Sequence, residues 1–344
     1  MGRPSLGTAL DSIAAQRHAA IEVVLVAAAG HAHPQPPSHC GRHPIRFVRS
    51  EQRLLRPDAA NAGLDAATGD WITFLDDDDR ILPWHVSGLV EAAHAVPEAM
   101  VLYSLARAVF ADGTVQSFGQ PFCLMQLYER NFIHLSTALI ARSPRVAGCR
   151  FDSRLDMHED WDFFLQLAHC VPLHFVPLQS FEWHADAGES GGGGGRNHDA
   201  MKFASLRDQV YEKWATARDA LIDQVQELLK ASVGAAQRGD YALARASCHR
   251  VLDISQNDPY ALNVLASVDR LSGDLPAARR VLAIALAVRP QDASLYYNMA
   301  LLCRELADRD GAVAAAGRAV VLEPDNLQYL QLQAALRQHA APAV

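Results

Sequence analysis

The stretch Trp71-Ile-Thr-Phe-Leu-Asp-Asp-Asp-Asp-Arg80 decides how the N-terminal part of this sequence folds. Its aromatic and branched residues predict a strand that is buried on both faces. Asp76 to Asp79 follow where the strand would leave the sheet, and ligands bind at that edge of an open α/β sheet. Four adjacent carboxylates repel one another, which indicates a hard divalent cation with oxygen ligands. A solvated acidic turn is the simpler alternative.

A second acidic cluster, Leu155-Asp-Met-His-Glu-Asp-Trp-Asp162, precedes an apolar run over 163–168 that predicts a helix. Glu159, Asp160 and Asp162 would lie at or before its first turn, where carboxylates interact favourably with the helix dipole. Helix capping alone would account for acids at this place. Three acids, a histidine and a tryptophan within 158–162 exceed that need, so we interpret the cluster as functional.

Other segments of the N-terminal part alternate helical and strand patterns, which is typical of an α/β domain. Helices are predicted over 6–16, 61–68 and about 83–95, and strands over 21–26, 45–49, 101–104, 106–110 and 131–140. Asn61 is expected to begin the second helix, as its N-cap, and Asp112-Gly113 to form a hairpin turn. The proline-rich segment 31–43 holds four histidines and a cysteine. We interpret it as a surface loop, because no ligand pair lies on a regular element.

The glycine run 191–195 follows another strand pattern that ends near Phe181-Glu-Trp-His-Ala-Asp186. Five glycines do not hold one conformation without a partner, so the run predicts a linker or a mobile lid. Arg196 and His198 lie just beyond it and would meet an anion when such a lid closes.

Composition excludes several classes of protein. The chain has 344 residues, a net charge of -8 and a pI near 6.0, which argues against a nucleic-acid surface. No apolar run is long enough for a membrane span, and the N-terminus lacks the apolar core of a signal peptide. Six scattered cysteines without a CxxC pair favour reduced thiols. We therefore expect a cytoplasmic protein, either free or peripheral at the inner membrane.

An internal repeat begins beyond about residue 201, where the sequence becomes rich in alanine and leucine. Gly239-Asp240 recurs as Gly273-Asp274, 34 residues later (273 − 239). The same spacing relates Ala244, Ala278 and Ala312, and also Pro290 and Pro324. This register resembles the tetratricopeptide repeat, with three repeats over 225–326 and a closing helix over 327–337. A plain helical bundle does not predict the register, and stacked repeats form a superhelix with a concave binding face.

The two acidic clusters together resemble the signature of family 2 glycosyltransferases. Residues 61–79 carry an Asn-x-Gly helix start, an Ala-x-Gly turn, an apolar strand and an Asp-x-Asp element. His158-Glu-Asp-Trp-Asp162, preceded by Arg150-Phe-Asp152, is similar to the family's Glu-Asp-Trp/Tyr motif in order and distance. The resemblance covers about 6–200 and implies a GT-A fold, a Rossmann-like domain that binds a nucleotide sugar.

The resemblance also implies roles for individual residues. Asp76 would lie on the ribose side of the nucleotide and, with Asp78, would hold a Mn²⁺ or Mg²⁺ ion that bridges the donor's diphosphate. Asp77 and Asp79 would only shape the turn. Asp160 would be the general base that deprotonates the acceptor hydroxyl, with inversion at the sugar carbon. The other assignments are Glu159 and Trp161 at the acceptor, His184 at the metal or diphosphate, and Asn61 and Arg196 on the donor side.

Two departures from the family pattern favour an alternative to an active enzyme. The family's first strand, which lies inside the sheet, is missing ahead of the helix 6–16, so we expect a gap between its neighbours. Ala27-Ala-Ala-Gly30 replaces an Asp-Asp-Gly-Ser-like element that holds base and ribose, and Ala60 stands where relatives often carry an arginine. A domain that no longer takes a donor would then act as a scaffold for the repeats.

We therefore predict a glycosyltransferase domain over 1–215 and a repeat domain over 216–344. The leading hypothesis is an inverting, metal-dependent enzyme that moves a sugar from a nucleotide-diphosphate donor to an acceptor hydroxyl. The acceptor would be a glycan, a lipid-linked molecule or a protein, and the repeats would recruit it or a protein or peptide partner. The first alternative is the impaired scaffold. The second is a metal-dependent phosphoryl-transfer or hydrolase site, and the lack of a glycine-rich phosphate loop in the sequence argues against it.

Overall fold

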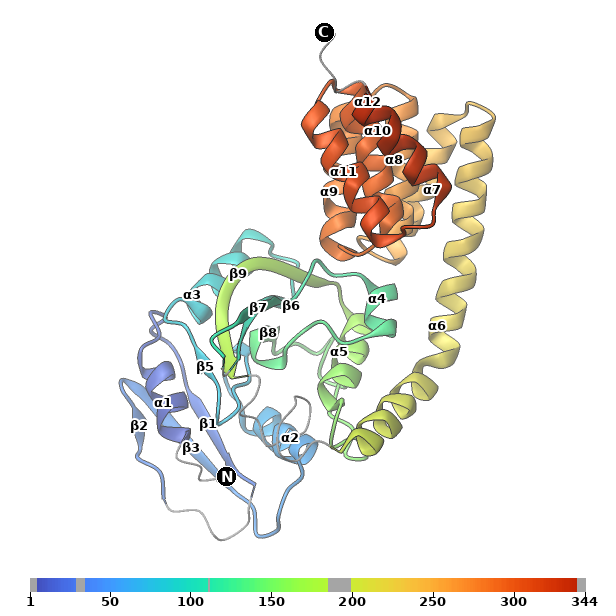
Figure 1. Ribbon diagram of the computed structural model, residues 1–344. Helices are drawn as coiled ribbons and strands as arrows, with labels where there is room; N and C mark the ends of the chain where they lie inside the picture. Colours follow the sequence, from blue (N-terminus) through green and yellow to red (C-terminus); the bar gives the residue numbers. More distant parts are fainter. Residues whose placement is uncertain (1–4, 29–34, 111, 185–198, 339–344) are drawn as a thin grey trace. The chain divides into compact units, whose positions relative to one another are not determined.

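The computed structural model of the protein describes residues 5–28, 35–110, 112–184 and 199–338. They form two compact units. Met1–Gln120 with Leu127–Ala215 make an α/β unit, and Pro121–Gln126 with Thr216–Val344 make a helical unit. The predicted fold class, an α/β domain followed by an all-α repeat domain, is confirmed (Figure 1).

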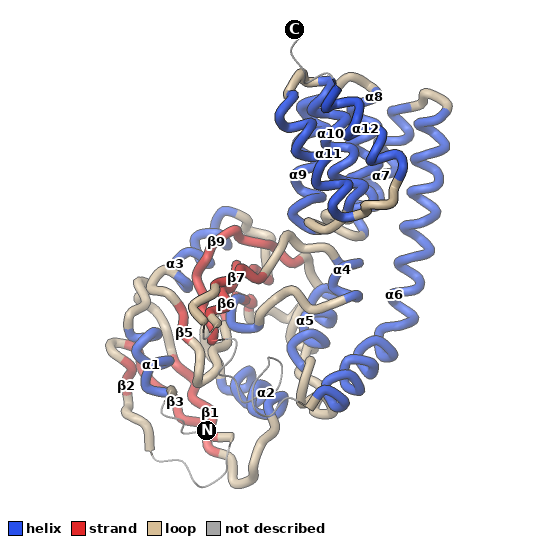
Figure 2. Tube along the Cα trace, in the orientation of Figure 1, coloured by secondary structure: helices blue, strands red, loops and turns tan. Residues whose placement is uncertain are grey.

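The described strands of the α/β unit form two sheets (Figure 2). The smaller sheet has the order β1-β3-β2, with β1 (Val23–Ala27) parallel to β3 (His43–Arg49) and β2 (His39–Cys40) antiparallel to it. Among the described strands, β1 and β4 belong to different sheets. Glu22, just before β1, connects that strand to the segment before β4. Its Oε1 accepts from the backbone N–H groups of Thr68 at 2.5 Å and Gly69 at 2.9 Å.

The larger sheet has the order β4-β8-β6-β9-β5, and β7 pairs with β6 off this path. Its long central strands, β6 (Val101–Val109) and β9 (Leu173–His184), run parallel. The shorter strands are antiparallel to their neighbours and are β4 (Trp71–Ile72), β5 (Arg80–Ile81), β7 (Val115–Phe118) and β8 (Ala138–Ala141). This pairing holds together the segments that carry the first acidic motif and its surroundings.

Helices cover the sheets and bury an apolar core. α1 (Leu6–Ala14) packs on β2 and β5, α2 (Arg56–Ala66) on β1 and β3, and α3 (His85–Ala95) on β6, β8 and β9. One buried cluster joins Leu89 and Ala93 of α3 to Leu102 of β6 and Leu139 of β8. α4 (Leu124–Glu129), the 3₁₀ turn η2 (Leu135–Thr137) and α5 (Glu159–Cys170) complete the elements up to residue 184.

Several predicted boundaries are wrong. The strand at 71–75 is only two residues long and half-buried, because β4 has a single neighbour, β8, among the described strands. Asn61 lies within α2 and does not begin it, since the helix begins at Arg56 with Pro57 in its first turn. The two strands predicted over 101–110 are one strand, β6, with an irregularity around Leu105. The strand predicted over 131–140 is reduced to β8, because η2 precedes it.

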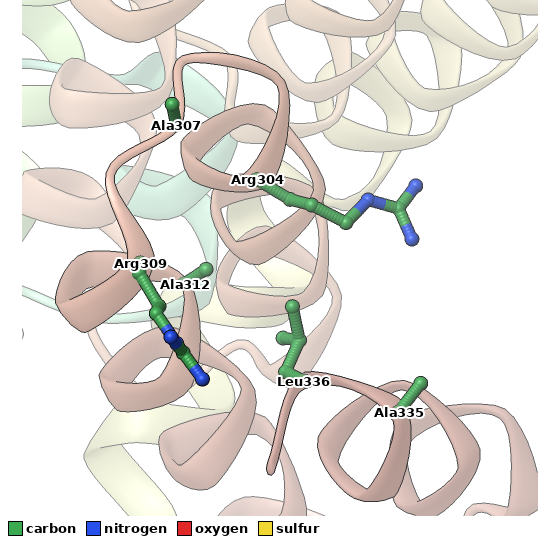
Figure 3. A pocket seen from close by; sticks show the side chains of 6 residues that line it. All are labelled: Arg304, Ala307, Arg309, Ala312, Ala335 and Leu336. Atoms are coloured by element: carbon green, nitrogen blue, oxygen red, sulfur yellow. The ribbon is translucent and has the colours of Figure 1, made fainter. Parts of the chain in front are cut away.

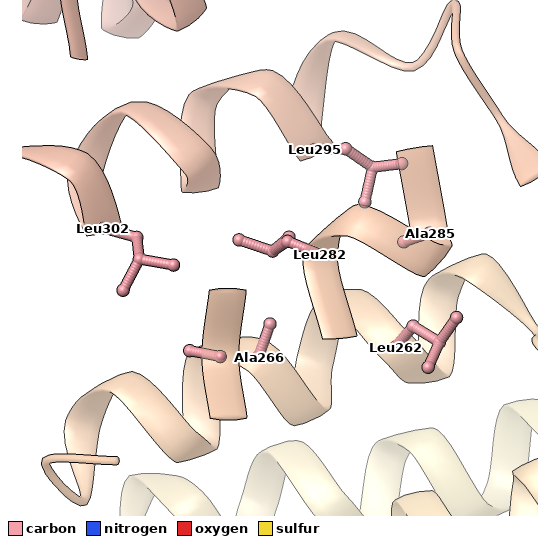
Figure 4. Close-up of a cluster of buried hydrophobic side chains, with 7 residues drawn as sticks. Leu262, Ala266, Leu282, Ala285, Leu295 and Leu302 are labelled. Atoms are coloured by element: carbon pink, nitrogen blue, oxygen red, sulfur yellow. The ribbon is translucent and has the colours of Figure 1, made fainter. Parts of the chain in front are cut away.

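The helical unit follows the predicted 34-residue register. Its helices are α6 (Ala200–Gln237), which begins in the α/β unit, then α7 (Tyr241–Ile254), α8 (Pro259–Leu271), α9 (Leu275–Val288), α10 (Ala293–Glu305), α11 (Arg309–Leu322) and α12 (Leu327–Gln338). Ala244, Ala278 and Ala312 are almost fully buried, as close helix packing requires of small residues. Figure 4 shows how leucines of α8, α9 and α10 meet at Leu282 and form the core of the central repeats.

Aspartates cap the repeat helices at the same interval. The side chains of Asp240, Asp274 and Asp308 each accept from the backbone N–H three residues later, at 3.0 Å. Each cap satisfies an N–H group that the helix start leaves without a partner. In the part of the chain that the structure describes, no helix is both long and apolar enough to cross a membrane.

Candidate active site

The first acidic motif forms the loop between β4 and β5. Carboxylate oxygens of Asp76, Asp78 and Asp79 lie within 4.8 Å of one another. The backbone N–H of Asp79 donates to the carbonyl of Asp76 at 3.2 Å, which turns the loop and brings these side chains together. Burial, and then the charges of Asp76 and Asp78, raise the pKa of Asp79 to about 8. Asp79, expected only to shape the turn, therefore belongs to the acidic group.

The second acidic motif lies at the beginning of α5. His158 adopts a left-handed backbone conformation with φ of 62° and directs the chain into the helix. Glu159 and Asp160 then occupy the first turn, where the helix dipole favours carboxylates. Burial raises the pKa of both carboxyl groups above their ordinary values. The motif therefore holds two carboxylates that bind a proton more tightly than exposed carboxylates do, a property suited to general acid–base chemistry.

Arg56 connects the two acidic motifs. Its Nη2 lies 3.2 Å from Asp76 Oδ2, and its Nε lies 3.0 Å from Glu159 Oε1. Burial disfavours its charge, but the carboxylates of Asp76, Glu159 and Asp160 outweigh that effect and raise the pKa of Arg56. One guanidinium thus contacts both motifs, so the residues that the sequence analysis paired lie in one site. We call Asp76, Asp78, Asp79, Glu159 and Asp160 the acidic site.

Asn131 orients the carboxylate of Asp160. Its Nδ2 donates to Asp160 Oδ2 at 3.0 Å, and the backbone N–H of Trp161 donates to Asp160 Oδ1 at 2.7 Å. The Asn131 side chain is itself held, since its Oδ1 accepts from the N–H of Ile133 at 3.0 Å. These contacts fix the direction of the carboxylate of Asp160, which is the predicted base.

His134 lies close enough to the acidic site to interact electrostatically with Asp76 and Arg56. Its ring stacks against Trp183 at 5.2 Å and lies 4.4 Å from the ring of Phe181, while its Nδ1 accepts from the N–H of Ser136 at 3.2 Å. Burial lowers the pKa of His134 to about 4. The imidazole is therefore neutral at neutral pH and, since Nδ1 accepts, carries its proton on Nε2.

The polar side-chain atoms of Asn61 and Trp161 form hydrogen bonds with the backbone of the α/β unit. Both polar atoms of the Asn61 side chain contact the backbone of Phe151, with Nδ2 to the carbonyl at 2.8 Å and Oδ1 to the N–H at 3.0 Å. Trp161 is 2% exposed, and its indole N–H donates to the carbonyl of Leu127 at 2.6 Å. Asn61 therefore positions the segment that leads to α5, and Trp161 supports the site from the core.

The third acid of the second motif, Asp162, is fully buried and contacts two side chains of α6. It accepts from Lys213 Nζ and from the indole N–H of Trp214, each at 2.8 Å. His184 is the last residue of β9, opposite Val109 of β6. Arg196, His198 and the glycine run lie outside the described residues, so their predicted roles stay predictions.

Arg56, Asn131 and His134 are the residues of the site that the sequence analysis missed. None of them has a local signal, because each meets the acids through contacts between distant segments. Only the Arg-Pro pair at 56–57 marks a helix start and so points indirectly to the first turn of α2.

Oxygen donors make the acidic site suitable for a hard divalent cation. Three carboxylates that converge within 4.8 Å, one of them buried among like charges, match the ligand type that Mg²⁺ and Mn²⁺ prefer. Two cavities lie elsewhere. One, of about 340 Å³, lies in the helical unit between α10, α11 and α12, with Arg304 and Arg309 in its wall (Figure 3). The other, of about 300 Å³, lies beside Asp152 and Lys213 in the α/β unit.

The described residues form an α/β unit with an acidic loop between β4 and β5, followed by a unit of stacked helix pairs. Comparison with known proteins makes the first part specific, because residues 2–135 match the model of glycosyl transferase family 2. Residues 2–135 are therefore similar to family 2 glycosyltransferases, and the helices of the helical unit follow the 34-residue register of tetratricopeptide repeats.

Two known glycosyltransferases are similar to the chain. The amylovoran biosynthesis glycosyltransferase AmsB of Erwinia amylovora is 29% identical over 194 residues, which cover 48% of this chain and 62% of that protein. The uncharacterized glycosyltransferase YwdF of Bacillus subtilis (strain 168) is 28% identical over 207 residues, which cover 54% of this chain and 72% of that protein. The chain thus spans less than two thirds of the length of AmsB.

Among solved structures, the first TPR domain of Spaghetti (RPAP3) bound to an HSP90 peptide is 18% identical, with a TM-score of 0.34. The similarity covers 35% of this chain and 98% of that domain.

Proposed function

We propose that the protein is an inverting, metal-dependent glycosyltransferase that moves a sugar from a nucleotide-diphosphate donor to an acceptor hydroxyl. The observation that carries the proposal is the contact of Arg56 with both Asp76 and Glu159. It places the motif proposed for the donor beside the motif proposed for the acceptor, and transfer in one step needs the two substrates in contact.

Asp160 is the proposed general base. Its raised pKa and its two hydrogen bonds, from Asn131 and the Trp161 N–H, support this role. A base with a raised pKa takes the proton of an acceptor hydroxyl more readily than an ordinary aspartate does. Glu159, which shares the first turn of α5, is proposed to position the acceptor.

Asp76, Asp78 and Asp79 are proposed to hold Mn²⁺ or Mg²⁺, while contacts of His184 and Arg196 with the metal or diphosphate stay predictions from the sequence. When bound, the cation would stabilise the negative charge of the departing nucleoside diphosphate. Within the chain, Asp79 supports this assignment because it is buried beside like charges, an arrangement that a cation would relieve.

Calorimetry on the full chain tests the metal site. Mn²⁺ is titrated first, and UDP, GDP, ADP, CDP and dTDP follow as probes of the donor's leaving group. We expect Asp78→Ala to weaken Mn²⁺ binding, and the Mn²⁺-dependent binding of the nucleotide, by about tenfold or more. Asp70→Ala is the matched control, because Asp70 is an exposed acid just before β4. Unchanged Mn²⁺ affinity in Asp78→Ala would contradict the assignment.

The alternative function is a scaffold that acts through its repeats. The observation that favours it is the end of β1, where Ala27 and Ala28 are buried and offer no polar side chain to a base or ribose. In that case no nucleoside diphosphate would bind with or without Mn²⁺, while a protein or peptide partner would still bind the repeats. Under the leading proposal, the repeats recruit the acceptor or such a partner.

A further inference from the structure

Arg56 brings a permanent positive charge into a site that is proposed to hold a metal ion. The guanidinium contacts Asp76 at 3.2 Å and Glu159 at 3.0 Å. Its side chain is 40% exposed, the Asp76 side chain 49% and the Glu159 side chain 7%. Arg56 therefore contacts an accessible carboxylate on one side and a buried one on the other.

The fold fixes Arg56 at this place. It is the first residue of α2, and two side chains of α2 tie the helix to the segment that leads to α5. Asn61 contacts the Phe151 backbone in both directions, and Asp58 Oδ1 accepts from Ser153 Oγ at 2.5 Å. The same segment continues into Glu159, so α2 presents Arg56 to the acids on a rigid base.

A guanidinium and a divalent cation compete for the oxygens of Asp76. Arg56 uses Asp76 Oδ2, and Asp76 is one of the three acids whose oxygens converge. Two cations a few ångströms apart also repel each other, so the presence of Arg56 opposes metal binding. The same charge attracts an anion such as a diphosphate, because Arg donates several N–H groups to phosphate oxygens.

We propose that Arg56 is a positioning residue that serves as the internal counter-cation of the acidic site. In the metal-free protein it holds Asp76 and Glu159 in place; it weakens the binding of a divalent cation alone and strengthens the binding of the donor's diphosphate. The inference rests on the proposed function, since it assigns a role toward the same metal and donor.

Arg56 also links the binding of the metal to the binding of the diphosphate. A diphosphate that contacts Arg56 would draw the guanidinium away from Asp76 and add negative charge. Each change favours the cation, so the metal and the diphosphate should each raise the affinity for the other. Arg56 thus makes metal binding depend on the donor, which limits occupation of the site by free cations.

Arg56→Gln tests the inference through binding, without an activity assay. For charges a few ångströms apart in a water-like dielectric, Coulomb's law gives a change of about tenfold. We expect Arg56→Gln to bind Mn²⁺ about tenfold more tightly and inorganic pyrophosphate, in the presence of EDTA, about tenfold more weakly. Opposite signs are the decisive result, because a merely structural role would weaken both.

Two variants control the experiment. Arg150→Gln removes a charge that also pairs with an acid of α2, Asp65, at 2.9 Å, and should change neither affinity. Arg56→Lys keeps the charge and should stay close to the wild type in Mn²⁺ affinity. Far-UV circular dichroism checks that each variant folds. If Arg56→Gln does not fold, pyrophosphate binding to the wild type in EDTA tests the inference instead. A wild type that does not bind pyrophosphate would overturn it.

The outcomes separate the two proposals. If the wild type binds Mn²⁺ and Arg56→Gln binds it with equal or lower affinity, the inference is wrong and the metal site stands. If neither protein binds Mn²⁺, the metal site and the inference both fail.

Discussion

The acidic site and the repeat array are built from contacts of very different range in the sequence. Arg56 meets Asp76, 20 residues away, and Glu159, which is 103 residues away (159 − 56). In the repeats, by contrast, Asp240, Asp274 and Asp308 cap helices through N–H groups only three residues later. One region therefore carries a periodic signal and the other does not, because a local contact recurs in every repeat whereas a contact between distant residues occurs once.

The two regions also use their aspartates differently. The repeat caps satisfy N–H groups that each helix start would otherwise leave without a partner, which stabilises the fold. The acids of the site instead lie near one another. Burial, and then the neighbouring carboxylates, raise the pKa values of Asp79 and Glu159, which costs stability and favours a cation or a proton. Substitutions in the two regions should therefore separate activity from stability.

The largest effect is expected at Asp160. Asp160→Asn keeps the size of the side chain and removes the proposed base, so sugar transfer should fall by about a thousandfold. Nucleotide binding should remain, since the proposed donor contacts are elsewhere. Transfer is measured with the donor and acceptor that give turnover in the wild type, and nucleotide affinity by calorimetry.

Asp70→Asn is the matched control for Asp160→Asn, since it makes the same change at an exposed turn. Turnover of Asp160→Asn at the wild-type rate would show that the base is another residue.

In the repeats, Leu282→Ala should cost stability and leave the site intact. Leu282 is 1% exposed in the core of the central repeats (Figure 4). The cavity left by its truncation should lower the free energy of unfolding by about 2–5 kcal/mol. Thermal and denaturant unfolding of the full chain, followed by helical circular dichroism, measures the loss. Ile284→Ala in the same helix, where the side chain is 40% exposed, should cost much less.

Mn²⁺ affinity of Leu282→Ala provides the comparison with the acidic site. It should equal that of the wild type under conditions where the variant is folded. A loss of Mn²⁺ binding in the folded variant would mean that the acidic site depends on the packing of the repeats.

The smallest effect is expected at a helix cap. Asp274→Ala removes the acceptor for the Ala277 N–H, which is bonded at 3.0 Å, and should destabilise the repeats by about 1 kcal/mol. Asp274→Asn keeps a cap acceptor and should lie close to the wild type in the same unfolding measurement. Equal losses in the two variants would show that charge, and not the cap bond, is what Asp274 contributes.

Sequence patterns predicted the repeat helices well because the packing of each helix depends on neighbours one repeat away. The alanines at 244, 278 and 312 follow directly from that register. In the α/β unit the elements were predicted and their ends were not. α2 begins at Arg56 and not at Asn61, since Pro57 and the extended Leu55 set its start. β4 is two residues long because pairing, which depends on β8, decides how far a strand extends.

The order of the domains, the 34-residue repeat and the two acidic motifs can be recognised from residues that are close together along the chain. The contacts of Arg56 with Asp76 and Glu159, the bond from Asn131 to Asp160 and the place of Asp79 in the acidic group depend on the three-dimensional fold. Charge and hydrogen bonding act over a few ångströms in space, whatever the separation along the chain. Folding brings these distant residues within that range.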